Sequence, residues 1–117
     1  MHRAIKGVAI SVIVATSIAL SSAALAQATS GQMIINNMMT GWGADSFAIQ
    51  TYGYTPVNPA NCPSSDYYQV DGIDGGYKTL YAAALIAYTN RTPVYIVVSN
   101  TDCRNTRPKI IGITLAK

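Results

Sequence analysis

Histidine and glutamate are nearly absent from this sequence. Of its 117 residues one is a histidine, His2, and all five acidic residues are aspartates. Histidine is the commonest general base and the commonest metal ligand in proteins, so its absence after residue 2 argues against a hydrolase or a zinc protein. The serines also lack a base that could activate them, barring a lysine partner, and the sequence around Lys78, Lys109 and Lys117 does not favour that role. We therefore expect no enzyme activity, no catalytic residue, no cofactor and no metal.

Because the chain has no glutamate, a paired-carboxylate catalytic site or a metal site would have to be built from aspartates alone. Asp71 and Asp74 stand close together in the segment D-G-I-D-G-G, a spacing that invites a calcium-loop interpretation. The other oxygen ligands of a regular calcium loop are missing, however, so a plain turn is the better prediction. This segment is therefore not expected to bind a metal.

The first 26 residues have the pattern of a secretory signal peptide. Arg3 and Lys6 give a positive start, residues 7–20 are mainly apolar, and residues 24–26 form an A-x-A motif. We expect cleavage before Gln27 and a secreted or periplasmic location. A membrane anchor is the alternative, but hydroxyl residues interrupt the apolar run, which ends in small residues instead of a charged stop. A stable anchor is therefore not expected.

The mature domain would be small and nearly neutral. Removing residues 1–26 leaves 117 − 26 = 91 residues, 27–117, which is enough for one domain with one modest core. Two of the eight Lys and Arg leave with the signal, so 8 − 2 = 6 cations face five Asp and the net charge is +1. No basic patch indicates nucleic-acid binding.

Cysteine is scarce, and the two cysteines that exist predict a single disulfide. An even count in an exported chain is typical of a structural bond, so Cys62 and Cys103 are expected to pair. Both lie in segments rich in turn-forming residues, and we expect both in loops. No accompanying ligands favour a metal-binding or catalytic pair.

Residues 77–91 and 94–98 carry the strongest secondary-structure signals, for a helix and a buried strand. Asp74 is predicted to cap the start of the helix, and Asn90 to end it in a left-handed conformation. The opposite helix face is hardly polar, so coverage by another subunit is one interpretation and tolerated exposure of alanine is the other. One stripe at helical spacing is predicted to face the core: Tyr77, Tyr81, Leu85 and Tyr88.

Four further segments are predicted as strands, namely 32–40 with a bulge at 36–37, 46–52, 67–70 and 110–115. The order is three strands, one helix and two strands. This order predicts a mainly β (β+α) fold, a small OB-fold-like five-stranded barrel with the helix between strands 3 and 4. The helix stripe is expected to pack on Phe47, Ile49, Ile96, Ile111 and Ile113.

Aromatic and neutral polar side chains are plentiful where charge is scarce. The chain has one tryptophan and eight tyrosines. Sugars are bound by stacking on aromatic faces and by hydrogen bonds from neutral polar groups, so this composition favours glycan recognition. Five aromatic residues fall in predicted loops or near strand ends: Trp42, Tyr52, Tyr54, Tyr67 and Tyr68.

The helix and the following strand resemble one toxin family. Leu80, Tyr81, Ala84, Leu85, Tyr88, Thr89, Pro93, Val94 and Ile96 match the helix-to-strand segment of the B subunits of subtilase cytotoxin and pertussis-like typhoid toxin. Ser30-Gly31 also resembles the start of the family's first strand. The resemblance implies a secreted OB-fold subunit, a pentameric homo-oligomer, a catalytic A subunit as partner, and a serine that contacts a sialylated glycan.

The family's sugar site carries over only in part. The serine role falls on Ser30, but Val98 stands where those subunits have a sugar-contacting tyrosine. We therefore predict a non-catalytic, toxin B-subunit-like binding module with a glycan ligand contacted by Ser30, Trp42 and Tyr52. The alternative is an exported structural or inhibitory small protein that does not bind sugar.

Overall fold

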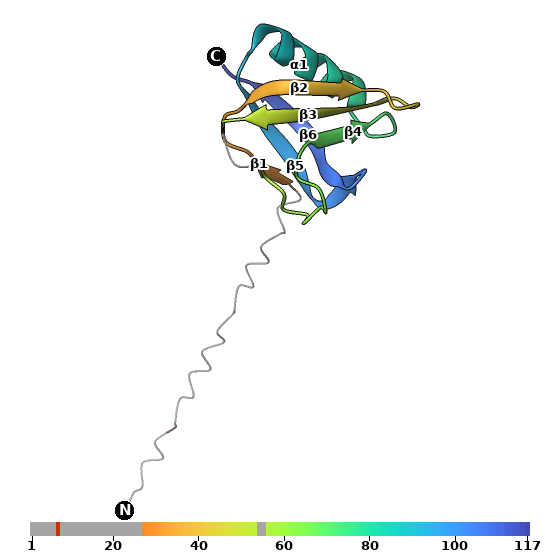
Figure 1. Ribbon diagram of the computed structural model, residues 1–117. Helices are drawn as coiled ribbons and strands as arrows, with labels where there is room; N and C mark the ends of the chain where they lie inside the picture. Colours follow the sequence, from red (N-terminus) through yellow and green to blue (C-terminus); the bar gives the residue numbers. More distant parts are fainter. Residues whose placement is uncertain (1–6, 8–26, 54–55) are drawn as a thin grey trace, which may run out of the picture.

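The computed structural model describes residue 7, residues 27–53 and residues 56–117 (Figure 1). Apart from residue 7, the predicted signal peptide lies outside these residues, and so does Tyr54. The described part contains six strands and one helix, in the order β1 (Gln27–Thr29), β2 (Ile34–Thr40), β3 (Ser46–Tyr52), β4 (Tyr68–Asp71), α1 (Tyr77–Asn90), β5 (Val94–Arg104) and β6 (Arg107–Leu115).

The strands form one mixed sheet in the order β1-β5-β6-β4-β3-β2. All neighbouring strands are antiparallel except β4 and β6, which run parallel. The predicted mainly β fold with one helix between β4 and β5 is therefore confirmed. A closed five-stranded barrel is not confirmed, because the sheet has six strands and two edge strands, β1 and β2. An isolated bridge joins Met33, just before β2, to Val94 in β5.

The additional strand is β1, which is not among the segments predicted as strands. Its residues have no apolar alternation, but Ala28 pairs with Val98 of β5 and Gln27 pairs with Ser99. β5 is long enough to offer this edge because it runs to Arg104, well past the predicted end at residue 98. The pairing therefore comes from tertiary context and not from local propensity.

Helix α1 packs on the sheet above β2 and β6 (Figure 1), but through a different stripe from the one predicted. Its buried residues are Leu80, Ala84 and Ala87. The predicted core residues Leu85 and Tyr88 are each 42% exposed. The small alanines let the helix approach the sheet closely, and this rotates Leu85 and Tyr88 outward.

Tyr77 and Tyr81 keep their predicted place against the core. Their rings lie 5.8 Å and 5.7 Å from the ring of Phe47, which is buried in β3. Ile49 and Ile96 are fully buried, as predicted. The helix and the sheet therefore share one hydrophobic core.

A bulge in β6 overturns the prediction that Ile111 is a core residue. Val97 pairs with Gly112 but Val98 pairs with Ile110, so Ile111 has no partner on β5. The extra residue shifts the side-chain alternation. Ile110 is thus buried and Ile111 is 38% exposed, while Ile113 packs partly buried against the core. The predicted bulge in β2 is confirmed, since Asn36 is skipped between two registered pairs.

Cys62 and Cys103 form a disulfide, as predicted, with their Cα atoms 5.8 Å apart. Cys62 lies in the loop between β3 and β4. Cys103 lies in β5, so the prediction of a loop position for it is wrong. A disulfide indicates a non-cytosolic location. In residues 27–53 and 56–117 no helix is long and apolar enough to cross a membrane.

The ends of α1 also differ from the prediction. Gly76, with φ of 77°, precedes the first helical residue, and the Asp74 side chain makes no capping bond. Instead the Asp74 carboxylate accepts hydrogen bonds from Arg104 and from the backbone of Asp71. The left-handed residue at the C-terminal end is Arg91 and not Asn90. The left-handed cap thus lies one residue later than predicted, and the helix itself ends at Asn90.

Candidate functional site

The turn between β2 and β3 holds Trp42 out in solvent. Gly41, Trp42 and Gly43 have φ values of 94°, 75° and 82°, a run of three left-handed residues. The turn is closed by a hydrogen bond from the Gly41 amide to the Ser46 carbonyl, 3.0 Å long, and by the Ser46 hydroxyl, which donates to the Gly41 carbonyl. The tryptophan is 86% exposed. A bulky residue in this strained conformation is a feature typical of functional sites.

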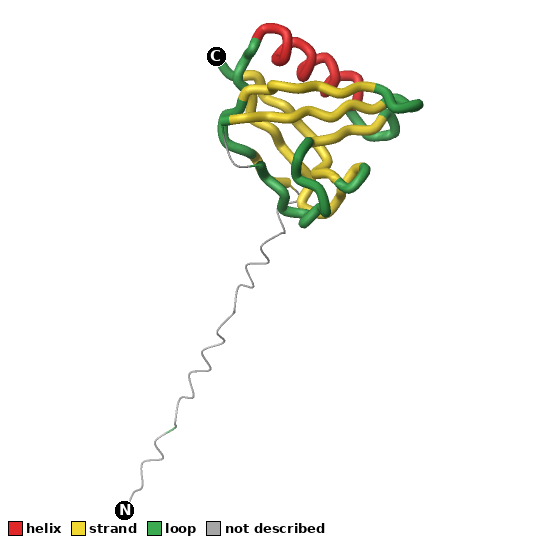
Figure 2. The backbone as a smooth tube through the Cα atoms, in the orientation of Figure 1, coloured by secondary structure: helices red, strands yellow, loops and turns green. Residues whose placement is uncertain are grey.

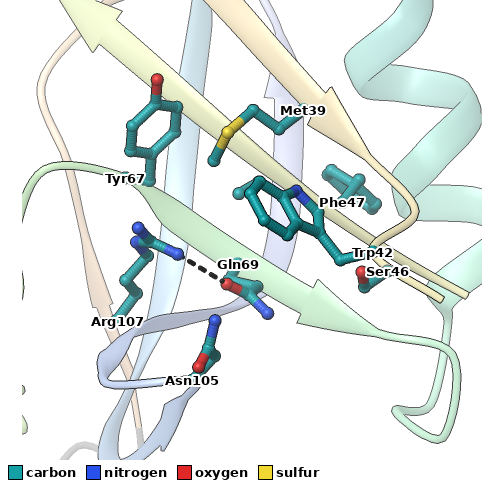
Figure 3. A pocket seen from close by; sticks show the side chains of 9 residues that line it. Met39, Trp42, Ser46, Phe47, Tyr67, Gln69, Asn105 and Arg107 are labelled. Atoms are coloured by element: carbon teal, nitrogen blue, oxygen red, sulfur yellow. Dashed lines mark hydrogen bonds between the residues drawn. The ribbon is translucent and has the colours of Figure 1, made fainter. Parts of the chain in front are cut away.

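A cavity of about 420 Å³ opens beside this tryptophan, within the range of small-ligand pockets (Figure 3). Its floor is the β3 and β4 surface, and its sides are the β2–β3 and β5–β6 turns. Figure 2 shows that the β2–β3 turn and the loop after β4 protrude at the same end of the sheet. The lining residues are Met39, Trp42, Ser46, Phe47, Ala48, Tyr67, Gln69, Asn105 and Arg107.

Asn105 reaches the cavity because β5 and β6 are joined by a two-residue turn. Arg104 pairs with Arg107, and the residues between them, Asn105 and Thr106, have φ of 46° and 67°. Two consecutive positive φ values match the twist of a tight antiparallel hairpin, and asparagine tolerates this conformation well. The hairpin therefore presents Asn105 on a rigid support.

The Arg107 side chain is held in place on three sides. Its Nε and Nη2 donate to the Asp66 carboxylate at 3.0 Å and 3.4 Å, and its Nη1 donates to Gln69 Oε1 at 3.3 Å. The guanidinium also lies 5.2 Å from the centre of the Tyr67 ring. The hydrogen bond from Arg107 lowers the pKa of Asp66, so this carboxylate offsets the arginine charge.

Gln69 is the buried polar group at the base of the cavity. It is 7% exposed and lies in β4. Its Oε1 accepts from Arg107, and its Nε2 donates to Asp71 Oδ1 at 3.0 Å. A primary amide has two N–H groups and two lone pairs, and these bonds use one of each. Gln69 therefore has hydrogen-bonding capacity left for a ligand beside the indole and Asn105 (Figure 3).

The structure separates the three residues predicted to contact a glycan. Only Trp42 lines this cavity. Tyr52 lies at the far end of β3, six residues from its start at Ser46 or roughly 20 Å along an extended strand. It is 45% exposed, and its hydroxyl accepts a hydrogen bond from Arg91 Nη2 at 3.1 Å.

Ser30 is a buried structural residue. Its hydroxyl donates to the Gly31 carbonyl at 2.7 Å and accepts from the Ile96 amide at 2.8 Å. The residue is 5% exposed and lies near the β5 edge, before β2 begins. The geometry gives no support to the prediction that Ser30 contacts a sugar.

Of the other aromatic candidates, Tyr67 lines the cavity and Tyr68 does not. Tyr68 is 2% exposed, and its hydroxyl accepts from the Val57 amide at 2.8 Å. Burial raises the pKa of this hydroxyl. No local signal in the sequence marks Gln69, Asn105 and Arg107 as site residues, because their approach to Trp42 depends on the pairing of β4 with β6.

The described residues offer no obvious metal centre, since no group of three or more His, Cys, Asp or Glu among them could hold an ion. Comparison with models of known protein families and with curated proteins found no match. The resemblance to toxin B subunits therefore stays a prediction.

Proposed function

We propose that this protein is a secreted, non-catalytic glycan-binding module whose site is the cavity beside Trp42. The observation that carries the proposal is an 86% exposed tryptophan at the rim of a cavity that also holds Gln69 and Asn105. A sugar ring would stack its apolar face on the indole and exchange hydrogen bonds with the two amides. The turn already holds the indole outward, so binding would require little reorganisation.

The place of the cavity supports an OB-like interpretation of the fold. Strands β2, β3 and β4 form an antiparallel series, β4 runs parallel to β6, and the Met33–Val94 bridge links the β2 end to β5. We propose that this arrangement is an OB-like barrel extended by β1. OB folds bind oligosaccharides and oligonucleotides on the face of their second and third strands, between two hairpin loops. In this chain that face is β3 and β4.

Trp42→Ala tests the proposed function. We expect the variant to bind its best glycan at least about tenfold more weakly than the wild type, because it loses the stacking surface. Binding is measured on a glycan array and then by calorimetry. Tyr95→Ala is the matched control, since Tyr95 is an exposed aromatic residue on β5 that does not line the cavity, and it should bind normally. Absence of wild-type binding, or equal binding by Trp42→Ala, would contradict the proposal.

We also propose that the protein is a homo-oligomer with α1 at the subunit interface, a pentamer by the family resemblance. Leu85, Ile86 and Tyr88 of α1 are 42%, 51% and 42% exposed. An amphipathic helix normally buries such side chains. By the same resemblance a catalytic A subunit would be the partner, and a toxin-like enzyme encoded beside this protein's gene would support that pairing.

Ile86→Glu tests the oligomer. We expect light scattering of residues 27–117 to give an oligomer for the wild type and a monomer for Ile86→Glu, because the charge would be buried in the interface. Ile73→Glu is the control, since Ile73 is 89% exposed in the loop after β4. A monomeric wild type at tens of micromolar would refute this part of the proposal.

A further inference from the structure

A second cavity, of about 730 Å³, adjoins the first, and Trp42 lines both. The two cavities share four lining residues, namely Trp42, Ser46, Gln69 and Asn105. The second extends toward Asp45, Asp71 and Ile73, along the loop that follows β4. The indole therefore stands between two contiguous depressions.

Each depression by itself falls in the size range that accommodates a small ligand of several rings. A single sugar ring stacked on the indole would leave most of this surface uncovered. A chain of two or more rings would pass over Trp42 and use the shared amides of Gln69 and Asn105 from both sides. The shape therefore favours an oligosaccharide over a monosaccharide.

The wall of the second cavity is rigid because two segments meet there without a side chain between them. The Gly72 amide donates to the Asp45 carbonyl at 2.6 Å, and a Cβ added to Gly72 would lie 2.6 Å from the Asp45 Cβ. Only glycine permits this close approach. It places the Asp45 and Asp71 side chains along one wall.

The charge along this surface is negative. Asp45 and Asp71 line the second cavity, and neither is in a salt bridge within the described residues. Among the described lining residues of both cavities, Arg107 is the only cation, and Asp66 already pairs with it.

The negative charges of Asp45 and Asp71 also contribute to the pKa shifts of neighbouring groups. The pKa of the Tyr77 hydroxyl is raised, first by burial and then by the nearby charge of Asp45, with a smaller contribution from Asp71. The pKa of Arg104 is raised, first by the hydrogen bonds that its guanidinium donates to Asp74 and to a smaller extent by the charge of Asp71. Arg104 is therefore already paired with Asp74. An acidic sugar over the second cavity would therefore be repelled by the charges of Asp45 and Asp71, which no cation among the described lining residues of that cavity offsets.

We propose, resting on the glycan-binding function, that the two cavities form one extended site for an oligosaccharide of at least two rings that is neutral or basic, and that acidic oligosaccharides are excluded. This ligand class differs from the sialylated glycans that the toxin resemblance implies. The difference arises from Asp45 and Asp71 and from the neutralised Arg107.

The test is a glycan array of neutral, amino-substituted and carboxylated oligosaccharides of one to four rings, followed by calorimetry with the strongest ligand and its shorter forms. We expect affinity to rise at least tenfold from one ring to three, and acidic members to bind at least tenfold more weakly than neutral members of equal length. Asp45→Asn combined with Asp71→Asn should remove most of this discrimination. Asp102→Asn, an exposed carboxylate outside both cavities, should not change it.

The outcomes separate this inference from the function on which it rests. Wild-type binding that depends on Trp42 but treats acidic and neutral glycans equally, or one ring and three rings equally, would overturn the extended neutral-or-basic site and leave glycan binding standing. Unchanged discrimination in the double variant would also overturn it. No binding by any glycan class would overturn both.

Discussion

A variant that lacks both cysteines is expected to lose about 4 kcal/mol of unfolding free energy relative to the oxidised protein. The estimate follows from the sequence separation of 41 between Cys62 and Cys103, through the chain entropy that the closed loop removes from the unfolded state. A domain of this size has only about 5–10 kcal/mol in total. The disulfide therefore supplies a large part of the free energy of unfolding.

The disulfide also fixes the long loop between β3 and β4, which contains no helix or strand in residues 56–67. The loop also has hydrogen bonds, among them the mutual pair between Asn58 and Cys62, the bond from the Ser64 amide to the Thr106 carbonyl and the bonds from Arg107 to Asp66. The loop leads into Tyr67 at the candidate site. Loss of the disulfide should therefore make the candidate site less ordered as well as lower the stability of the fold.

Urea denaturation of Cys62→Ser combined with Cys103→Ser measures this effect. By the scaling for small domains, the melting temperature should fall by roughly 15–30 °C. Ser64→Ala provides the control, because its side chain makes one exposed hydrogen bond and its loss should change stability by less than about 1 kcal/mol. A double-serine variant within about 1 kcal/mol of the wild type would refute the entropic argument.

Local signals were sufficient to predict the elements whose pattern does not depend on distant partners. Residues 46–52 alternate cleanly and form β3 with those bounds. The alanine-rich segment forms α1 close to its expected limits. The pair Asn36-Asn37 interrupts an apolar run, and the bulge occurs there. In each case the deciding feature is a periodicity or its interruption.

Features that depend on packing were not predictable in the same way. The stripe of Leu80, Ala84 and Ala87 has helical spacing similar to that of the predicted stripe. Packing on the sheet buries these three residues, whereas of the predicted stripe only Tyr77 and Tyr81 pack against the core. Ile110 and Ile111 are both apolar, so the bulge in β6, which depends on pairing with β5, decides which one is buried. Periodicity cannot choose between two apolar faces.

The candidate site likewise combines one residue that has a local sequence signal with others that only the fold brings to it. Trp42 could be identified from the sequence because it stands between two glycines in a predicted turn, where a side chain is normally exposed and not part of the core. Its partners could not, because Gln69 comes from β4, and Asn105 and Arg107 come from the hairpin of β5 and β6. The parallel pairing of β4 and β6 brings these segments together, and it leaves no local mark.

The buried carboxylate of Asp74 is expected to have the second-largest effect on stability. Its side chain is 2% exposed and pairs with Arg104 at 2.6 Å and with Lys109 at 3.4 Å. Asp74→Asn would leave both cations facing an uncharged amide. Removing one member of a buried pair costs about 3–5 kcal/mol, and we expect the lower end because the Arg104 side chain is 25% exposed.

Asp66→Asn is the matched control for this substitution. Asp66 also pairs with an arginine, Arg107, but its side chain is 50% exposed. Exposed pairs contribute about 0–1 kcal/mol, so this variant should unfold at nearly the wild-type urea concentration. If the two asparagine variants lost equal stability, burial would not be the reason for the importance of Asp74.

The pH dependence of unfolding gives Asp74 a signature that a packing defect would not produce. Burial alone would raise the pKa of this carboxyl, but the hydrogen bonds from Arg104 and the Asp71 amide and the charge of Lys109 together lower it below the ordinary value of 3.8. A carboxyl with a lowered pKa stabilises the fold fully above its unfolded pKa, and this contribution is lost as the pH falls through the folded pKa. Wild-type stability should therefore fall below about pH 4 more steeply than that of Asp74→Asn, and the difference between the two variants should narrow as the pH decreases. Parallel curves from pH 7 to pH 2 would show that the substitution acts through packing and not through the charge of Asp74.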